Sequence, residues 1–378
     1  MKKATIKDVA REAGVSITLV SKVLNAKRTA SGRLDCSVSD SSAQKILDAV
    51  KRLGYKPNKA AASLRKGRDN RIGVILPDIS NGFFSDLARH IENEAYSAGY
   101  SVLFGSSDEN SRKLGNLVDT FITDGVDGMI IIPCTGCEGQ ITMATDRNIP
   151  IVLAIRDIPS MKNVGKVIPD SATAVEMALG HLYGNGFRKI EMVSSTMKIS
   201  NATDREHFYR EFMEQHSLSD FIRCNHVDDS NKSESMEYIV EDAVRRGVEA
   251  LFFPSASLPL FAMKACKKLG VRVPEDLAIF GFDGGDNYQL TTPSISQIHY
   301  SLEDSAKESF GMLKRIITEN AEPRTVILKP NLWIGGSTQK KQPCECSDSG
   351  AYPAGELVIR KLHEAIDMLK QDLQKNQI

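Results

Sequence analysis

The chain has few cysteines and no long hydrophobic run, and each absence excludes a class of protein. Its seven cysteines are an odd number spread over 378 residues, so we predict no disulfide framework and a reducing compartment. No apolar stretch reaches the ~18 residues that a membrane-spanning helix needs. The basic start Met1-Lys2-Lys3 is not followed by an apolar run, so we expect no signal peptide and a cytoplasmic location.

Metal and redox chemistry have little support in the sequence. Cys134 and Cys137 have the spacing of a redox pair or half a zinc site, but no second Cys or His pair lies nearby. Cys344 and Cys346 have only one residue between them, which rarely makes a structural site. An enzyme that used Cys134 and Cys137 would need a partner base that the sequence does not identify. We therefore predict no metal, no cofactor and no catalytic activity.

The zero net charge of the chain conceals an uneven distribution. Residues 1–68 hold 16 Lys and Arg against 5 Asp and Glu, whereas residues 69–378 hold 32 against 43. A basic segment attracts DNA phosphates and releases their counterions, while an acidic body avoids them. We therefore expect the first part of the chain to bind DNA.

The first 25 residues have the pattern of two short helices joined by a sharp turn. Thr5 can cap the first helix, with Asp8 completing a capping box. Gly14 can take the left-handed conformation that ends this helix, and Ser16 can cap the second. This pattern predicts a helix-turn-helix unit.

The second helix would turn Ile17, Thr18, Ser21 and Lys22 outward. In a helix-turn-helix, the first residues of the second helix reach base edges in the major groove. A short apolar side chain, hydroxyls and a cation suit that role. The alternative is a helix pair that serves only packing, and the basic charge of the region argues against it.

Beyond residue 70, short apolar runs alternate with amphipathic stretches, which is typical of parallel βαβ units. The first series predicts strands at 72–76, 101–105, 128–132 and 151–154, and helices at 83–98, 114–123 and 141–147. The second predicts helices at 171–184, 204–216, 233–246 and 258–269, and strands at 189–194, 222–227, 249–253 and 277–281. A helix at 301–318 and a strand at 325–328 follow. We predict an α/β body of two doubly wound parallel-sheet lobes with a ligand cleft between them.

Ordered motifs run along most of the chain, at residues 5–25, 53–65, 72–81, 126–130, 270–276 and 281–283. Together they resemble the lactose-repressor (LacI/GalR) family of bacterial transcription regulators over roughly residues 4–336. The resemblance implies a DNA-binding regulator, more often a repressor than an activator, with a body like a periplasmic sugar-binding protein. The alternative is a sugar-binding receptor that shares the body without a DNA function. The basic head and the missing signal peptide argue against that alternative.

The resemblance and the sequence patterns together divide the chain into five parts. These are a head at 1–56, a hinge helix and linker at 57–70, a body at 71–336, a linker at 337–353 and a C-terminal helix at 354–378. Within the body, we assign about 71–168 plus 297–324 to the first lobe, and about 169–296 plus 325–336 to the second.

The hinge helix after Pro57 is too short to be stable alone, so it could fold only on DNA. The resemblance implies that it pairs with its twin and inserts Leu64 into the minor groove, whereas Leu64 could instead pack on the body. The full set of expected DNA contacts is Thr5, Ser16, Ile17, Thr18, Ser21, Lys22, Asn25, Lys56, Asn58, Ala61, Leu64 and Arg65.

The resemblance also implies a small-molecule effector in the cleft, bound by Asn81, Phe83, Phe84, Arg205, Ser255 and Asp283. A carboxylate and a guanidinium would hold hydroxyls by charge-assisted hydrogen bonds, unless the two form only a surface ion pair. Four residues, at three places in the chain, depart from the family pattern. Ile155 replaces a common aspartate, Ser255-Ala256 a common Asn-Asp pair, and Gly82 a proline. These changes predict either a ligand less hydroxylated than a hexose or a body that senses little.

Two further segments have open roles. Residues 26–37 make a link several residues longer than is usual in the family, and its Lys27, Arg28 and Arg33 either contact phosphates or lie on a solvated loop. In the C-terminal part, aliphatic residues alternate at spacings of three and four, at Ile359, Leu362, Ile366, Leu369 and Leu373. Such a heptad pattern either joins two dimers or packs on its own body.

We expect a homodimer on a near-palindromic operator, and a tetramer if the C-terminal helices associate. The effector could be a sugar. The operator sequence, the identity of the effector and the direction of its effect on DNA binding do not follow from the sequence.

Overall fold

The computed structural model describes residues 4–26, 38–55, 69–197, 199–228 and 231–339. Several predicted segments lie outside these ranges. They are most of the 26–37 link, the hinge residues Lys56, Asn58, Ala61, Leu64 and Arg65, and the C-terminal heptad helix. Within the described residues, no helix is long and apolar enough to cross a membrane.

In the described residues 4–26 and 38–55, the head has three helices: α1 (Ile6–Ala13), α2 (Ile17–Asn25) and α3 (Asp40–Leu53). Each helix buries one face in a shared apolar core, and α1 packs against both α2 and α3. The side chain of Ser39 caps α3, and Gly54 ends it with a φ of 57°. The buried residues of this core are Val9, Ala10, Val20, Val23, Ala43, Ile46 and Ala49.

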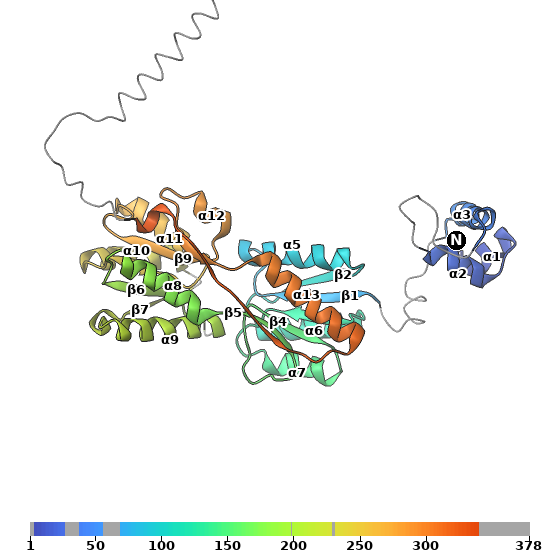
Figure 1. Cartoon of the computed structure of the whole chain (residues 1–378), viewed down its shortest axis with the longest axis horizontal. Coiled ribbons are helices and arrows are strands. Elements are labelled where there is room, and N and C mark those ends of the chain that lie inside the picture. Colours follow the sequence, from blue (N-terminus) through green and yellow to red (C-terminus); the bar gives the residue numbers. More distant parts are fainter. Residues whose placement is uncertain (1–3, 27–37, 56–68, 198, 229–230, 340–378) are drawn as a thin grey trace, which may run out of the picture. The chain divides into compact units, whose positions relative to one another are not determined.

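The first lobe is built on a six-stranded parallel sheet in the order β11-β5-β4-β3-β1-β2. The strands are β1 (Arg71–Leu76), β2 (Ser101–Ser106), β3 (Gly128–Ile131), β4 (Ile151–Ala154), β5 (Gly165–Pro169) and β11 (Thr325–Leu328). The helices are α5 (Gly82–Ser97), α6 (Ser111–Thr123), α7 (Glu138–Asp146) and α13 (Leu302–Glu319). Helices α5 and α13 pack together on one face of the sheet, and α6 and α7 on the other (Figure 1).

The second lobe has a sheet in the order β12-β10-β9-β8-β6-β7, parallel except for β12. Its strands are β6 (Ile190–Ser195), β7 (Cys224–Val227), β8 (Ala250–Phe252), β9 (Ala278–Phe282), β10 (Ser296–His299) and β12 (Asn331–Trp333). Its helices are α8 (Ser171–Gly184), α9 (Ser200–Gln215), α10 (Lys232–Arg245), α11 (Leu258–Leu269) and α12 (Gly285–Gln289). Two short 3-10 helices lie at Ser219–Phe221 and Gly336–Thr338. Helix α8 packs with α9, and α10 packs with α11.

The predicted alternation of strands and helices is confirmed, but the assignment of the lobes needs correction in two places. Strand β11, at 325–328, pairs with β5 and belongs to the first lobe. Residues 297–299 lie in β10, which pairs with β9 in the second lobe. Strands β5, β10 and β12 were absent from the prediction because their short segments lack a continuous apolar run.

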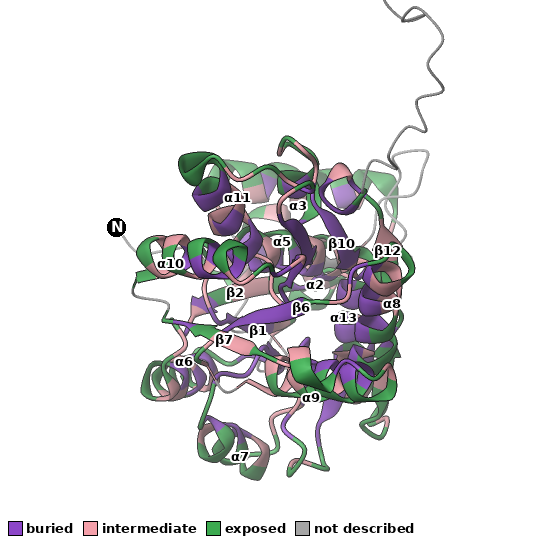
Figure 2. Ribbon diagram, turned by 90° about the vertical axis from the view of Figure 1, so that its left-hand side faces the viewer, coloured by how far each residue is buried: buried purple, intermediate pink, exposed green. Residues whose placement is uncertain are grey.

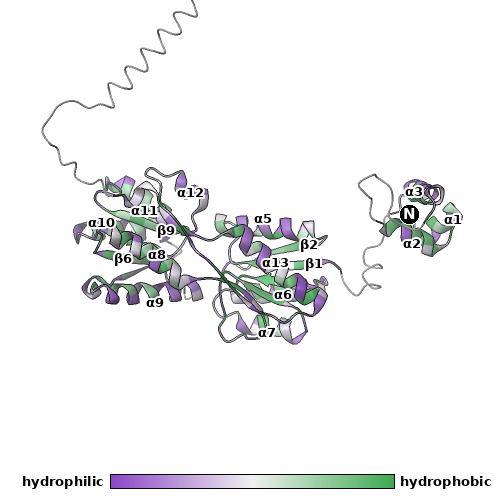
Figure 3. Ribbon diagram, viewed as in Figure 1, coloured by the Kyte–Doolittle hydropathy of each residue, from purple (hydrophilic) through white to green (hydrophobic). Residues whose placement is uncertain are grey.

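Burial follows the layers of both lobes. Strand β6 is buried along almost its whole length, whereas the outward faces of α9 and α10 are exposed (Figure 2). The strands of both lobes are largely hydrophobic, and the hydrophilic residues gather on the outward sides of the helices (Figure 3). The sheets therefore hold each lobe together through apolar contacts on both faces, as parallel sheets require.

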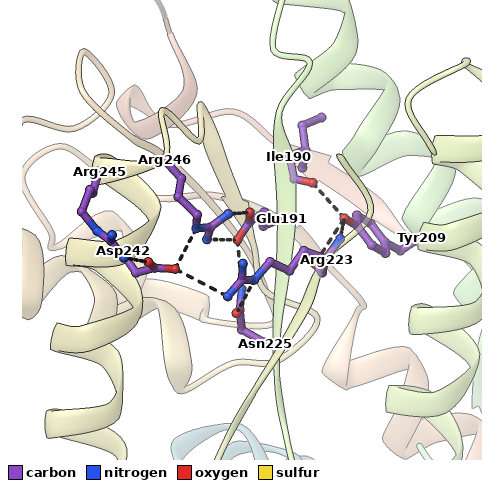
Figure 4. A network of polar contacts seen from close by, with 8 residues as sticks. All are labelled: Ile190, Glu191, Tyr209, Arg223, Asn225, Asp242, Arg245 and Arg246. Carbon is purple, nitrogen blue, oxygen red and sulfur yellow. Dashed lines mark hydrogen bonds and ion pairs between the residues drawn. The ribbon is translucent and has the colours of Figure 1, made fainter. Parts of the chain in front are cut away.

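A charged network closes the β7 edge of the second lobe (Figure 4). Arg246 forms a fork with both carboxylate oxygens of Glu191, one at 2.8 Å, and its Nε donates to Asp242 at 2.7 Å. Asn225 on β7 donates to Glu191 at 3.1 Å, and Arg223 lies 3.5 Å from Asp242. The hydrogen bond from Arg246 holds the pKa of Asp242 below its usual range. The network thus ties α10 to both β6 and β7.

We expect Glu191→Gln to destabilise the second lobe. The side chain of Glu191 is only 5% exposed, so the variant removes one of the two carboxylates that pair with the Arg246 guanidinium and leaves it with Asp242 alone. Loss of one partner of a buried pair should lower the free energy of unfolding by about 2 to 3 kcal/mol. Urea unfolding followed by circular dichroism would measure the change.

Glu308→Gln is the matched control, because the pair of Glu308 with Arg324 lies at the surface, with side chains 38% and 56% exposed. That variant should lower the free energy of unfolding by less than about 1 kcal/mol. Equal losses in the two variants would mean that the network does not stabilise the lobe.

Candidate functional site

Local capping fixes the turn between the first two helices of the head. The Thr5 amide donates to the Asp8 carboxylate at 2.9 Å, and Gly14 has a φ of 64°. The Ser16 hydroxyl accepts from the Leu19 amide at 3.2 Å at the start of α2. The capping interactions predicted from the sequence are therefore confirmed, and they set the direction in which α2 leaves the turn.

Helix α2 divides its residues between the core and the surface. Val20 and Val23 are buried against α1 and α3, whereas Ile17 is 40% exposed and Thr18 and Lys22 are also exposed. Ser21 is half-buried at the boundary. The face predicted to contact bases is therefore not needed to hold the head together.

A cavity of about 470 Å³ lies between residues of the two lobes. It is lined by all six residues expected at the effector site: Asn81, Phe83, Phe84, Arg205, Ser255 and Asp283. The first three lie at the start of α5 in the first lobe. In the second lobe, Arg205 lies on α9, which follows β6, while Ser255 and Asp283 follow β8 and β9. Because these strands are parallel, their carboxyl ends meet at one edge, where ligands bind in doubly wound folds.

Asp283 and Arg205 form the charged wall of the second lobe. Their side chains are 11% and 3% exposed, and the Arg205 Nη2 lies 3.9 Å from the Asp283 Oδ2. Arg205 also donates to the carbonyl of Pro254 at 2.8 Å and stacks 4.3 Å from the Phe282 ring centroid. This pair is buried at the cavity rather than exposed at the surface. Its 3.9 Å separation is longer than a direct hydrogen bond.

The first lobe contributes a second ion pair that the sequence did not reveal. Arg156 is 5% exposed and donates to both carboxylate oxygens of Glu109, at 2.8 and 2.9 Å. It also donates to the Pro133 carbonyl at 2.8 Å and lies 5.5 Å from the Phe84 ring centroid. No sequence signal connects Glu109 and Arg156, because they follow different strands and meet only when the loops adopt their folded conformation.

Backbone strain gathers at the cavity. The described residues contain eight non-glycine residues with positive φ, and four of them line the cavity: Asp108, Glu109, Ile155 and Asp283. Ile155 has a φ of 66°, a region that β-branched residues rarely enter. Such strain is concentrated at binding sites, where the surrounding structure maintains it.

Several buried polar atoms at the cavity have no hydrogen-bond partner among the described residues. They are the Nε atoms of Arg156 and Arg205, the Ser255 hydroxyl and the Asn201 Oδ1. Buried polar groups are rarely left unpaired in folded proteins. A ligand with both donors and acceptors would satisfy them, and the aromatic rings of Phe83 and Phe84 would cover its apolar face.

The two cysteines predicted as a possible pair are not among the residues that line this cavity. Cys134 and Cys137 are both buried free thiols. Within the described residues, no group of three His, Cys, Asp or Glu side chains could hold a metal ion.

We expect Asp283 to make the stability of the protein depend on pH. Burial raises its pKa to about 6, although Arg205 and the Tyr300 amide oppose the rise. A carboxyl group with a raised folded-state pKa lowers stability as the pH increases from about 4 to about 6. The free energy of unfolding of Asp283→Asn, relative to that of the parent, should therefore rise by on the order of 2 to 3 kcal/mol between those pH values. Urea unfolding across this pH range measures the difference.

The control is Asp286→Asn, which changes an exposed carboxylate three residues away. Measured over the same pH range, it separates the effect of burial at Asp283 from the general effect of removing one carboxylate nearby. If the difference between Asp283→Asn and the parent varies with pH no more than that of the control, the buried carboxyl titrates normally.

Both parts of the chain match known families. The family described as bacterial regulatory proteins, lacI family, matches residues 5–58. The periplasmic binding protein-like domain matches residues 179–338. These matches cover the helix-turn-helix and most of the second lobe together with its neighbouring segments.

A curated relative and two solved structures extend the similarity over most of the chain. The ribose operon repressor of Halalkalibacterium halodurans is 30% identical over 315 residues, which cover 82% of this chain and 89% of that protein. The lac repressor dimer bound to operator and the anti-inducer ONPF has a TM-score of 0.77 at 20% identity, covering 90% of this chain and 100% of that one. The CelR–cellobiose complex has a TM-score of 0.63 at 21% identity, covering 88% and 99%. With its head and body both matched, the chain belongs to the lacI family of bacterial transcription regulators.

Proposed function

We propose that this regulator represses transcription in the cytoplasm by binding a DNA operator through α2, and that a small molecule in the cavity controls its affinity for the operator. As a member of this family it is a transcription regulator rather than an enzyme. The observation that carries the proposal is the outward face of α2, where Ile17, Thr18 and Lys22 are exposed while the opposite face forms the core. A receptor without a DNA function would have no use for this face.

The effector that we propose is a sugar or a related metabolite. The cavity offers carboxylates, two guanidinium groups and serine hydroxyls for polar groups, and phenylalanine rings for an apolar face. The names of two similar proteins point the same way, because one is a ribose operon repressor and the other was solved with cellobiose. Ile155 makes part of the wall apolar, which favours a ligand with fewer hydroxyls than a hexose.

We further propose a homodimer that binds a near-palindromic operator. The lac repressor structure with a similar fold is a dimer bound to operator. A two-fold protein matches a two-fold DNA site, which places two recognition helices in successive major grooves. The heptad pattern beyond residue 353 would allow two such dimers to associate.

We expect Lys22→Ala to remove most of the preference for the operator. The operator is first selected with the full chain from a pool of random-sequence duplex DNA. Loss of one good base contact should reduce discrimination against random DNA by about 1 to 3 kcal/mol. Gel-shift titration of both DNAs measures this ratio.

Lys45→Ala removes the same charge from an exposed position on α3 and should leave the ratio unchanged. If the selection yields no enriched sequence, the proposed DNA function is wrong. If it yields one and Lys22→Ala retains the full preference, the recognition surface lies elsewhere.

We expect Asp283→Ala to uncouple the effector from DNA binding. A thermal-shift panel of ribose, cellobiose, other sugars, polyols and nucleosides identifies compounds that stabilise the parent protein. The variant should bind an active compound about 10 to 100 times more weakly, because it loses hydrogen bonds to a charged group. Its operator affinity should no longer respond to the compound at concentrations that act on the parent, since coupling requires unequal binding to two states.

Asp286→Ala, an exposed change nearby, should respond to the compound like the parent. If Asp283→Ala is stabilised as strongly as the parent, the effector binds at another site.

A further inference from the structure

Within the part of the body that the structure describes, the chain passes between the two lobes three times, at points far apart in the sequence. The first crossing follows β5, at Pro169 and Asp170. The second joins β10 to α13 through Tyr300 and Ser301, and the third joins β11 to β12 after Leu328. Any change in the angle between the lobes must be absorbed at these crossings, because they are the covalent connections.

Hydrogen bonds link the three crossings to one another at Asp170. The Tyr300 hydroxyl donates to the Asp170 carbonyl at 2.9 Å. The Asp170 amide donates to the Leu328 carbonyl, also at 2.9 Å. Tyr300 is only 5% exposed, so the first of these bonds is sheltered from water. The crossings therefore form a single hydrogen-bonded unit in which Asp170 joins Tyr300 of the second crossing to Leu328 of the third.

The same tyrosine contacts the cavity through its backbone. Its amide donates to the Asp283 Oδ1 at 3.2 Å, and its ring centroid lies 6.0 Å from the Arg205 guanidinium. The amide of Asp283 in turn donates to the Ile298 carbonyl on β10, two residues before Tyr300. Tyr300 thus connects the charged wall of the cavity to the lobe crossings, through its amide at one end and its hydroxyl at the other.

We propose that Tyr300 is the positioning residue that couples the cavity to the angle between the lobes. A ligand that binds the Asp283 carboxylate changes the hydrogen bond that this carboxylate accepts from the Tyr300 amide. The resulting displacement of Tyr300 passes through its hydroxyl to the first and third crossings. The physical basis is that a ligand shifts an equilibrium only through contacts that differ between two states. The proposal rests on the assignment of the cavity as the effector site.

The test measures the distance between the lobes in the full chain without effector or DNA. Spin labels are attached through p-acetylphenylalanine placed at Met143 on α7 and Tyr238 on α10, side chains that are 43% and 69% exposed. Labelled chain is mixed with excess unlabelled chain, so that only distances within one subunit are recorded. Pulsed electron spin resonance then gives the distribution of distances between the lobes.

Tyr300→Phe removes only the hydroxyl. The population at the parent's main distance, relative to all others, should fall about fivefold, the effect of one hydrogen bond on an equilibrium constant. The matched control is Tyr209→Phe, because the Tyr209 hydroxyl is also buried and donates to a carbonyl, that of Ile190, at 2.8 Å within the second lobe (Figure 4). Both variants should lower the melting temperature, but Tyr209→Phe should keep the parent's distribution.

Asp283→Asn tests the cavity end of the connection. It weakens the acceptor of the Tyr300 amide, so it should shift the distribution in the same direction as Tyr300→Phe. The double variant should show no larger shift than Tyr300→Phe alone, because both changes break one pathway. An unchanged distribution in Tyr300→Phe, an equal shift in Tyr209→Phe, or additive shifts in the double variant would each overturn the proposal. Since no effector or operator is used, these outcomes are independent of whether the proposed function holds.

Discussion

The hydrogen bonds that join the three lobe crossings are the constraint on which the cavity depends. The cavity wall is divided between lobes that are separate in their sheets, so its width is set by the crossings rather than by either core. One further bond between the lobes, from the Asp157 amide to the Ser200 hydroxyl at 2.9 Å, lies between the loop after β4 and the start of α9. A few hydrogen bonds of modest individual strength therefore determine the geometry of a site that the large apolar cores only support.

The cavity brings two energetically unfavourable features together. A carboxylate and a guanidinium are buried 3.9 Å apart, and an isoleucine is held in the left-handed region. Neither feature stabilises the fold, because burial of charge and backbone strain both raise its free energy. The network at Glu191 is different, since there each charged group is met by a close partner. Unfavourable features that remain together at one cavity indicate that binding, rather than stability, determines that part of the sequence.

The sequence allowed accurate prediction where structure depends on neighbouring residues. Thr5, Gly14 and Ser16 fix the head through contacts within three or four positions, and the βαβ pattern follows from local apolar runs. The lobe membership of β11 could not be predicted, because it depends on a pairing with β5 that is more than 150 residues away. The Glu109–Arg156 pair was missed for the same reason, since it requires two loops to adopt positive φ. Features that depend on neighbouring residues could be predicted from the sequence, whereas long-range strand pairing and loop conformation could not.

The division of polar groups between the lobes limits what an effector can be. Arg156 and Phe84 belong to the first lobe, while Arg205 and Asp283 belong to the second. A molecule that contacted only one wall would bind equally well at every lobe angle, and equal binding shifts no equilibrium however tight it is. Control of DNA binding therefore requires a ligand that reaches both walls at once. The unpaired Nε atoms of Arg156 and Arg205, one on each wall, are the two points that such a ligand would join.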